Sequence, residues 1–267
     1  MDTVIQIEHR NIEQIPALIV EKEEWEGRPH PTVIFLHGFQ SGKEHNLHYA
    51  YNLVNQGVRV VLPDAHLHGE RDDGADFARM SANFWKIVLT SIQELKQIYT
   101  ALKEEGLLME GKVGVGGTSM GAITTYGALA SYRWIDVAVA MMGNAHYELL
   151  AQGQLDYFKK KGLQLPVDQS VIDELFQMLE RVDLSKHLDR LNQRPLFIWH
   201  GEQDGIVPFS LTELLMKEIT PLYEGTSHLM FIRDEEAGHA VPRPAMLKST
   251  QWFSQHLVEA DELRNEK

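Results

Sequence analysis

Strand-like and helix-like segments alternate along most of the chain, and this alternation restricts the possible folds more than any other feature of the sequence. The run from Thr32 to Gly38, TVIFLHG, is apolar almost throughout and ends in glycine, as is typical of a strand covered on both faces. Similar runs follow at intervals that leave room for helices: VRVVLPD, KVGVGG, DVAVAMMG, RPLFIWHG and SHLMFIRD. The alternation predicts an α/β fold with a mostly parallel sheet and helices on both of its faces.

Helical patterns occupy the intervals between these runs. The predicted helices are EHNLHYAYNLVNQG, which ends at Gly57, a long one over 77–103, MGAITTYGALASY, LTELLMKEI, and a closing amphipathic helix over 244–263. Ahead of the first apolar run, TVIQIEH and IPALIV predict two short strands paired as a hairpin. The sequence therefore predicts one hairpin followed by successive strand–helix units.

The chain is interpreted as a single domain over 1–267, because α/β folds of this length often form one domain. Residues 144–192 interrupt the alternation, since they contain no strand pattern and much helical spacing. Within them, apolar residues recur at three- and four-residue steps and predict one apolar helix face: Val171, Leu175, Met178 and Val182. We therefore expect 144–192 to form a small helical cap inserted in the domain.

The composition excludes several classes of protein. With 38 acidic and 25 basic residues, the formal net charge is −13, which disfavours nucleic acid as a partner and gives no support for binding to an anionic membrane. The chain contains no cysteine, which excludes disulfides, thiolate catalysis and thiolate metal sites. The first residues lack the pattern of a secretory signal, and no apolar run approaches the roughly 18 residues of a membrane span. The expected location is the cytoplasm, and the oligomeric state cannot be derived from the sequence.

A serine stands where the strand run KVGVGG meets the helix that follows it. Residues 117–121 read Gly-Thr-Ser-Met-Gly, the G-x-S-x-G pattern of a nucleophile elbow, with Ser119 at its centre. Such a tight turn raises the hydroxyl above the sheet, and the glycines permit strained backbone angles and close packing of strand against helix. Ser119 is the predicted nucleophile, and the alternative is a glycine-rich turn with an incidental serine.

A serine hydroxyl needs a base to accept its proton and an acid to orient that base. We expect the base to be His239, in the loop DEEAGHAVPRP after the last strand run. His200, at a strand end, and His228, within a strand run, are the alternatives. The predicted acid is Asp204, in the turn of IWHGEQDGIVP, with Glu202 as its nearest rival.

The predicted nucleophile, acid and base each follow a strand run. Loops at the carboxyl ends of parallel strands meet at one edge of a sheet, so the three side chains can converge there. Acyl transfer also requires hydrogen-bond donors for the developing oxyanion. The predicted donors are the backbone N–H groups of Met120, directly after the serine, and of Phe39, in the turn FLHGFQSGK, with Gln40 as the reserve for Phe39. We expect His37 to shape this turn by hydrogen bonding.

Five motifs follow one another over about 32–241: FLHGFQSGK, LPDAHLHGER, GVGGTSMGA, WHGEQDGIVP and EAGHAV. In these motifs the sequence resembles the α/β-hydrolase superfamily, and within it the serine esterases related to dienelactone hydrolases and prolyl oligopeptidase catalytic domains. The resemblance implies an α/β-hydrolase fold and an esterase with the triad Ser119, Asp204 and His239, in the chain order of that superfamily. Dienelactone hydrolases use a cysteine nucleophile, which this chain lacks, so the resemblance favours simple ester hydrolysis.

The motif LPDAHLHGER permits a second interpretation. Asp64, His66 and His68 resemble the start of a metal site, because a His-x-His pair can place two imidazoles on one ion. The metallo-hydrolase pattern would continue with a further Asp-His pair, whereas Glu70 and Arg71 stand there. We therefore expect no metal and no other cofactor. The loop is expected to border the mouth of the active site, with Arg71 paired to a nearby carboxylate.

The predicted substrate is a small neutral carboxylic ester, because a short cap leaves a modest apolar pocket and the acidic surface disfavours anions. The residues expected to line this pocket are Phe84, Trp85, Leu149 and Phe176. A thioesterase, a deacetylase or a small-amide hydrolase would use the same triad, and the sequence does not separate them. A non-catalytic binding protein on the same fold is the remaining alternative, although no member of the triad is missing.

Overall fold

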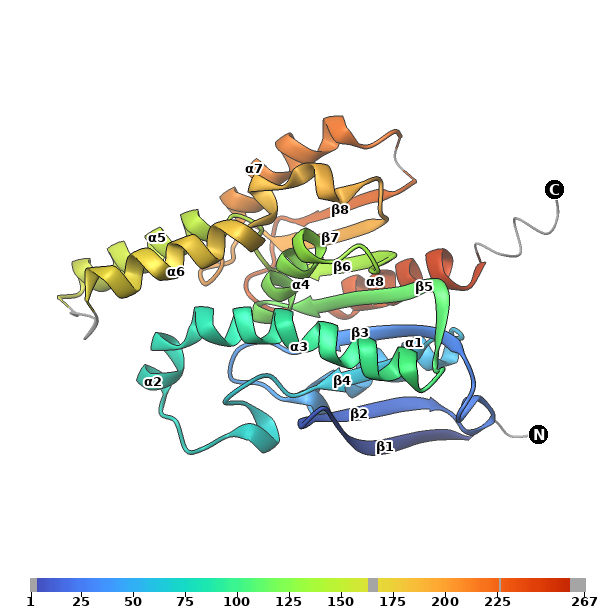
Figure 1. Ribbon diagram of the computed structural model, residues 1–267. Coiled ribbons are helices and arrows are strands. Elements are labelled where there is room, and N and C mark those ends of the chain that lie inside the picture. Colours follow the sequence, from blue (N-terminus) through green and yellow to red (C-terminus); the bar gives the residue numbers. More distant parts are fainter. Residues whose placement is uncertain (1–3, 163–167, 226, 260–267) are drawn as a thin grey trace.

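An eight-stranded sheet runs through the centre of the protein, in the order β1-β2-β4-β3-β5-β6-β7-β8 (Figure 1). The computed structural model describes residues 4–162, 168–225 and 227–259. The strands are β1 (Ile5–Ile12), β2 (Ile15–Lys22), β3 (His30–Leu36), β4 (Arg59–Pro63), β5 (Leu108–Thr118), β6 (Val137–Met141), β7 (Leu196–Gly201) and β8 (Leu229–Asp234).

The sheet is parallel except at one end. Strands β1 and β2 form an antiparallel hairpin, and β2 also pairs antiparallel with β4. All other neighbouring strands are parallel. Both the N-terminal hairpin and the mostly parallel sheet predicted from the sequence are confirmed. Because β3 to β8 run in the same direction, the loops that follow them lie along one edge of the sheet.

Helices cover both faces of the sheet. One face carries α1 (Leu47–Asn55) and α8 (Arg243–Leu257), which share an apolar cluster with the strands. The other face carries α3 (Phe84–Glu104), α4 (Met120–Ser131) and α7 (Phe209–Ile219) in a second cluster. This arrangement is the predicted α/β architecture.

Successive residues of the inner strands are buried on opposite sides of the sheet. In β4, Val60 packs in the cluster with α1 and α8, whereas Val61 packs in the cluster with α3 and α4. Both side chains are completely buried, and each contributes about 1.5–3 kcal/mol through removal of apolar surface from water. Burial on both faces explains why these strands form continuous apolar runs instead of alternating patterns.

The helix predicted over 77–103 is interrupted. The structure contains two helices there, α2 (Phe77–Ala82) and α3, which meet at Asn83. The Asn83 side chain donates a hydrogen bond to Arg79 O at 2.8 Å, and such local bonding by asparagine competes with a continuous helix. The apolar periodicity continues through the break, so the prediction of one long helix was wrong.

Two other helices differ from their predicted bounds only at their ends. Helix α1 begins at Leu47, because a 3₁₀ turn occupies Lys43–Asn46. Helix α8 ends at Leu257, and the predicted residues 260–263 lie outside the described residues. None of the helices in the described ranges combines the length and the apolar character that crossing a bilayer requires.

The segment between β6 and β7 is helical in its described part. Helices α5 (Tyr147–Lys160) and α6 (Gln169–Val182) lie side by side and project beyond the sheet (Figure 1). Residues 163–167 of the predicted cap lie outside the described residues. Of the predicted apolar face of α6, Leu175 and Val182 pack against the body, whereas Val171 and Met178 are exposed. The predicted face is therefore only partly covered.

Two glycines let helix α4 approach strand β3 closely. A Cβ atom on Gly121 would lie 2.3 Å from Leu36 O, and one on Gly117 would lie 2.6 Å from the same oxygen. Both distances are far below a normal contact, and the obstructing atom belongs to the backbone. The two glycines of the G-x-S-x-G motif therefore set the distance between the end of β3 and the start of α4.

An alanine at Gly121 should destabilise the fold, because strand and helix would have to separate. We expect Gly121→Ala to lower the free energy of unfolding by about 1–3 kcal/mol. The control is Gly153→Ala in α5, where an added Cβ meets nothing within 4 Å and helix propensity favours alanine by about 1 kcal/mol. Thermal unfolding of both variants measures the effect. Equal melting temperatures for the two variants would contradict the packing argument.

Candidate active site

Ser119 lies in the tight turn between β5 and α4. Its backbone has φ +53° and ψ −116°, a conformation that costs a non-glycine residue about 1–3 kcal/mol. Two backbone hydrogen bonds hold the turn: the Ser119 amide donates to Met141 O, and the Ile123 amide donates to Ser119 O, both at 2.9 Å. The strained angles are those expected of a serine raised above the end of the sheet.

His239 lies beside this serine. Its Nε2 atom is 2.8 Å from Ser119 Oγ, and its side chain is 21% exposed. The loop that carries His239 is tied to the neighbouring loop, because the Gln203 amide donates to Ala237 O at 3.0 Å. Gly201 permits this approach, since a Cβ atom there would lie 2.2 Å from Ala237 O.

The Asp204 carboxylate completes a continuous chain of hydrogen bonds. Its Oδ2 atom is 2.7 Å from His239 Nδ1 and 3.2 Å from His200 Nε2, and its Oδ1 atom accepts from the Ile206 and Val207 amides at 2.8 and 2.9 Å. Burial opposes ionisation, but the hydrogen bonds from His200, His239 and the two amides outweigh it and hold the pKa of Asp204 well below its usual value.

The carboxylate also determines where the proton of His239 lies. An ionised carboxylate only accepts hydrogen bonds, so Nδ1 of His239 carries the hydrogen and donates it to Asp204. The Nε2 atom is then left as an acceptor for the Ser119 hydroxyl. This tautomer is the one that a serine hydroxyl needs in order to lose its proton.

The structure thus brings together the three residues predicted as nucleophile, acid and base, and it assigns other partners to their rivals. His200 bonds to Asp204 and to Thr212 Oγ1, at 2.7 Å. Glu202 forms an ion pair with Arg233. His228 lies directly before β8 and its ring contacts that of His256. The contact of His200 with Asp204 was not predicted, although the four-residue spacing across the end of β7 was a usable signal.

Two backbone amides remain available near the serine. Met120 is the first residue of α4, so its N–H has no acceptor in the helix and lies at the positive end of the helix dipole. The amide of Gln40, the predicted reserve donor, already donates to His68 Nε2 at 3.1 Å. The Phe39 amide has no hydrogen-bond acceptor within the described ranges.

Most of the predicted pocket residues belong to one apolar cluster that includes Met120. Trp85 is buried in it, and Phe84 and Phe176 pack against it. The ring of Phe39 is 5.7 Å from that of Phe84. Leu149 differs, because it is 51% exposed and lies outside the cluster, whereas its neighbour Leu150 is inside.

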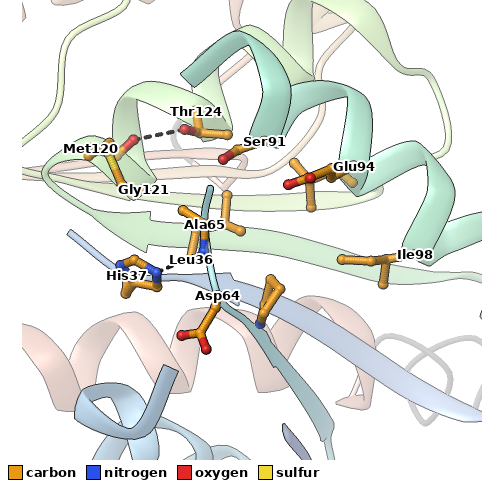
Figure 2. Close-up of a pocket in the computed structure, with 12 residues that line it drawn as sticks. Leu36, His37, Asp64, Ala65, Ser91, Glu94, Ile98, Met120, Gly121 and Thr124 are labelled. Atoms are coloured by element: carbon orange, nitrogen blue, oxygen red, sulfur yellow. Dashed lines mark hydrogen bonds between the residues drawn. The ribbon is translucent and has the colours of Figure 1, made fainter. Parts of the chain in front are cut away.

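A small cavity lies between helix α3, the start of α4 and the ends of β3 and β4 (Figure 2). Its volume is about 20 Å³, and its lining includes His37, Asp64, Ser91, Met120 and Gly121. A cavity of this size has room for about one water molecule. It is too small for an organic substrate, since ligand pockets typically measure about 300–1,000 Å³.

The loop predicted as a possible metal site contains an ion pair. The Asp64 carboxylate is 2.7 Å from Lys43 Nζ and accepts from the Lys43 and Glu70 amides. In the described ranges, no group of three or more histidine, aspartate or glutamate side chains is placed to hold an ion. Arg71 pairs with Glu94 through two bonds of 2.9 and 2.7 Å, as predicted for Arg71.

The strand order and the position of the serine turn after β5 define the class: the chain is an α/β-hydrolase. A solved structure with this fold, TT1662 from Thermus thermophilus, superposes with a TM-score of 0.76 at 22% identity, covering 96% of this chain and 99% of that one. The sequence matches the model of the prolyl oligopeptidase family over residues 44–259. The protein belongs to the prolyl oligopeptidase family.

Two curated relatives match along their whole length. "Putative esterase YitV" of Bacillus subtilis is 44% identical over 255 residues, which is 95% of this chain and 100% of the relative. "Esterase YjfP" of Escherichia coli is 32% identical with the same coverage. The family resemblance inferred from the five motifs is therefore confirmed.

The low pKa of Asp204 predicts a pH-dependent contribution to stability. Its folded-state pKa lies below the unfolded value of about 3.9, so its ionisation stabilises the fold above roughly pH 4, and this contribution is lost as the pH falls through the folded-state pKa. We expect Asp204→Asn to lower the free energy of unfolding by about 1–3 kcal/mol at neutral pH, and the difference from wild type to shrink in acid. Urea unfolding at neutral pH and below about pH 4 measures both. A difference that grows toward acid pH would overturn this assignment.

Proposed function

We propose that the protein is a carboxylic ester hydrolase that acts through an acyl-enzyme on Ser119. The observation that carries this proposal is the unbroken chain of hydrogen bonds from Ser119 Oγ through His239 to Asp204. The names of the two full-length relatives, both of which contain the word esterase, support the same activity.

In the first step, Ser119 Oγ attacks the carbonyl carbon of the ester while His239 Nε2 accepts the hydroxyl proton. The carbonyl electron pair moves to its oxygen, which becomes an oxyanion. The backbone N–H groups of Phe39 and Met120 donate to that oxygen, and one such donor typically contributes about 3–4 kcal/mol to the transition state. Asp204 stabilises the imidazolium that forms.

In the next step, the oxyanion collapses and the bond to the alcohol oxygen breaks. His239 Nε2–H delivers its proton to the leaving alkoxide, and the acyl group remains on Ser119 Oγ. Water then attacks the acyl carbon as His239 accepts a proton from it. The proton returns to Ser119 as the acid leaves, so the enzyme ends in its starting state.

The helices α5 and α6 act as a small cap that limits the acyl pocket, within a single hydrolase domain. The pocket walls are the rings of Phe84, Trp85 and Phe176, which lie in the cluster that contains Met120. Small neutral esters fit this proposal, because the net charge of −13 disfavours anionic substrates. The cytoplasmic location and the absence of nucleic-acid partners stay predictions from the sequence.

Removal of the serine hydroxyl should abolish turnover. We expect Ser119→Ala to lower kcat for p-nitrophenyl acetate by about 10⁴-fold or more, because the variant lacks the hydroxyl that forms the acyl-enzyme. The melting temperature should stay within a few degrees of wild type. A fluorophosphonate probe should label wild type and fail to label the variant. The control is Ser131→Ala at the end of the same helix, where the hydroxyl donates to Gly127 O. Wild-type turnover by Ser119→Ala would refute the mechanism.

The cap predicts a preference for short acyl chains. We expect wild type to hydrolyse acetate and butyrate esters with a higher kcat/KM than long-chain esters. Phe176→Ala should raise the kcat/KM ratio of octanoate to butyrate by about tenfold, because extra methylenes gain space. The control is Val171→Ala in the same helix, whose side chain is 50% exposed. A wild-type preference for long chains, or an equal change in both variants, would count against the pocket.

A further inference from the structure

Two buried histidines outside the triad connect the loop after β3 with the loop after β4. His37 and His68 are each 2% exposed, and their ring centroids are 5.2 Å apart. His37 starts the loop that contains Phe39, and His68 lies in the loop that follows Asp64. Neither residue takes part in the proposed proton transfers.

His37 fixes the peptide group that contains the Phe39 N–H. Its Nδ1 atom is 2.8 Å from Gly38 O. Its Nε2 atom accepts from the Ala65 amide at 3.0 Å, as Figure 2 shows. The Gly38 oxygen and the Phe39 N–H belong to one planar trans peptide and point in opposite directions. A bond that holds Gly38 O therefore also determines where the Phe39 N–H points.

His68 also contacts a carbonyl oxygen through Nδ1 and a backbone amide through Nε2, and that amide belongs to the next peptide of the same loop. Its Nδ1 atom is 2.9 Å from His66 O, and its Nε2 atom accepts from the Gln40 amide at 3.1 Å. The Gln40 N–H belongs to the peptide that follows Phe39. Gln40 has φ +58°, a left-handed conformation that is unfavourable for a residue other than glycine. The hydrogen bond to His68 is made by the amide of this strained residue.

We infer that His68 is a positioning residue, which holds the Phe39 N–H toward the substrate oxyanion by accepting the hydrogen bond of the Gln40 amide. This inference rests on the proposed function, because it assigns His68 to the oxyanion site of that mechanism. With both peptides beside Phe39 fixed, the donor cannot rotate away when the site is empty. Preorganised donors of this kind contribute more to catalysis than donors that must reorganise.

The role requires a neutral imidazole. Protonation of His68 at Nε2 would place two N–H groups against each other, and the Gln40 amide would lose its acceptor. Burial lowers the pKa of His68; the His66 carbonyl and the carboxylates of Asp64 and Asp72 oppose this shift, and the His66 ring adds to it. The His37 ring also faces His68, and burial lowers the pKa of His37 to about 4. Both rings therefore stay neutral near neutral pH.

Two amide variants separate the acceptor from the rest of the side chain. Glutamine can place its carbonyl oxygen near the position of His68 Nε2, whereas asparagine reaches only the position of Nδ1. His68→Gln therefore keeps an acceptor for the Gln40 amide, and His68→Asn does not. We expect His68→Asn to lower kcat for p-nitrophenyl butyrate by about 10–100-fold with KM changed less than threefold, because a misdirected oxyanion donor affects only the transition state. His68→Gln should recover kcat to within about fivefold of wild type.

The controls distinguish this inference from the proposed function. His45→Leu replaces an exposed histidine in the 3₁₀ turn Lys43–Asn46 after β3 and should leave kcat unchanged. If wild type is active and Ser119→Ala is not, equal kcat values for His68→Asn and His68→Gln would overturn the role of His68 and leave the esterase mechanism standing. A rise in KM without loss of kcat would also overturn it. An inactive wild type would overturn the proposed function itself, and the role of His68 with it.

Discussion

The close approach of helix α4 to strand β3 is the constraint on which the rest of the active site depends. Gly117 and Gly121 leave room for the Leu36 carbonyl, which a side chain at either position would strike. The start of α4 is thereby held beside the loop that begins at His37. Since Met120 opens the helix and Phe39 lies in that loop, one packing contact brings both proposed oxyanion donors to the same place. Ser119, between the two glycines, is fixed by the same contact.

A buried lysine, Lys43, holds the loops around this contact through ion pairs. Lys43 is 1% exposed, and its Nζ atom lies 2.7 Å from Asp64 Oδ2 and 2.6 Å from Glu70 Oε1. Burial favours a neutral Lys43, but the carboxylates outweigh it and raise the pKa of Lys43. A buried ion pair adds little net stability, yet losing one partner is costly. The ion pair between Lys43 and Asp64 therefore keeps the loops after β3 and β4 in one arrangement.

The sequence predicts those parts of the site that depend on topology. Ser119, Asp204 and His239 were predictable because each follows a strand, and parallel strands bring their carboxyl ends to one edge. The contact between His68 and Gln40 was not, because it joins residues 28 positions apart through a particular side-chain rotamer and tautomer. The sequence also did not predict which cap leucine is buried. The rotation of α5 about its axis decides that Leu150, and not the adjacent Leu149, lies in the apolar cluster.

The roles of the histidines around the serine correlate with their exposure to solvent. His37 and His68 are buried, and each needs one unprotonated ring nitrogen to accept its hydrogen bond from a backbone amide. A charge on either ring would abolish an acceptor and leave a buried cation without a carboxylate in direct contact. His239 has a partly exposed side chain and an anionic partner in Asp204, so a positive charge on its ring is stabilised when it forms. In the proposed mechanism, histidine therefore has two different roles. His37 and His68, buried among backbone groups, are fixed hydrogen-bond acceptors. His239, which faces a carboxylate and the substrate, carries a proton.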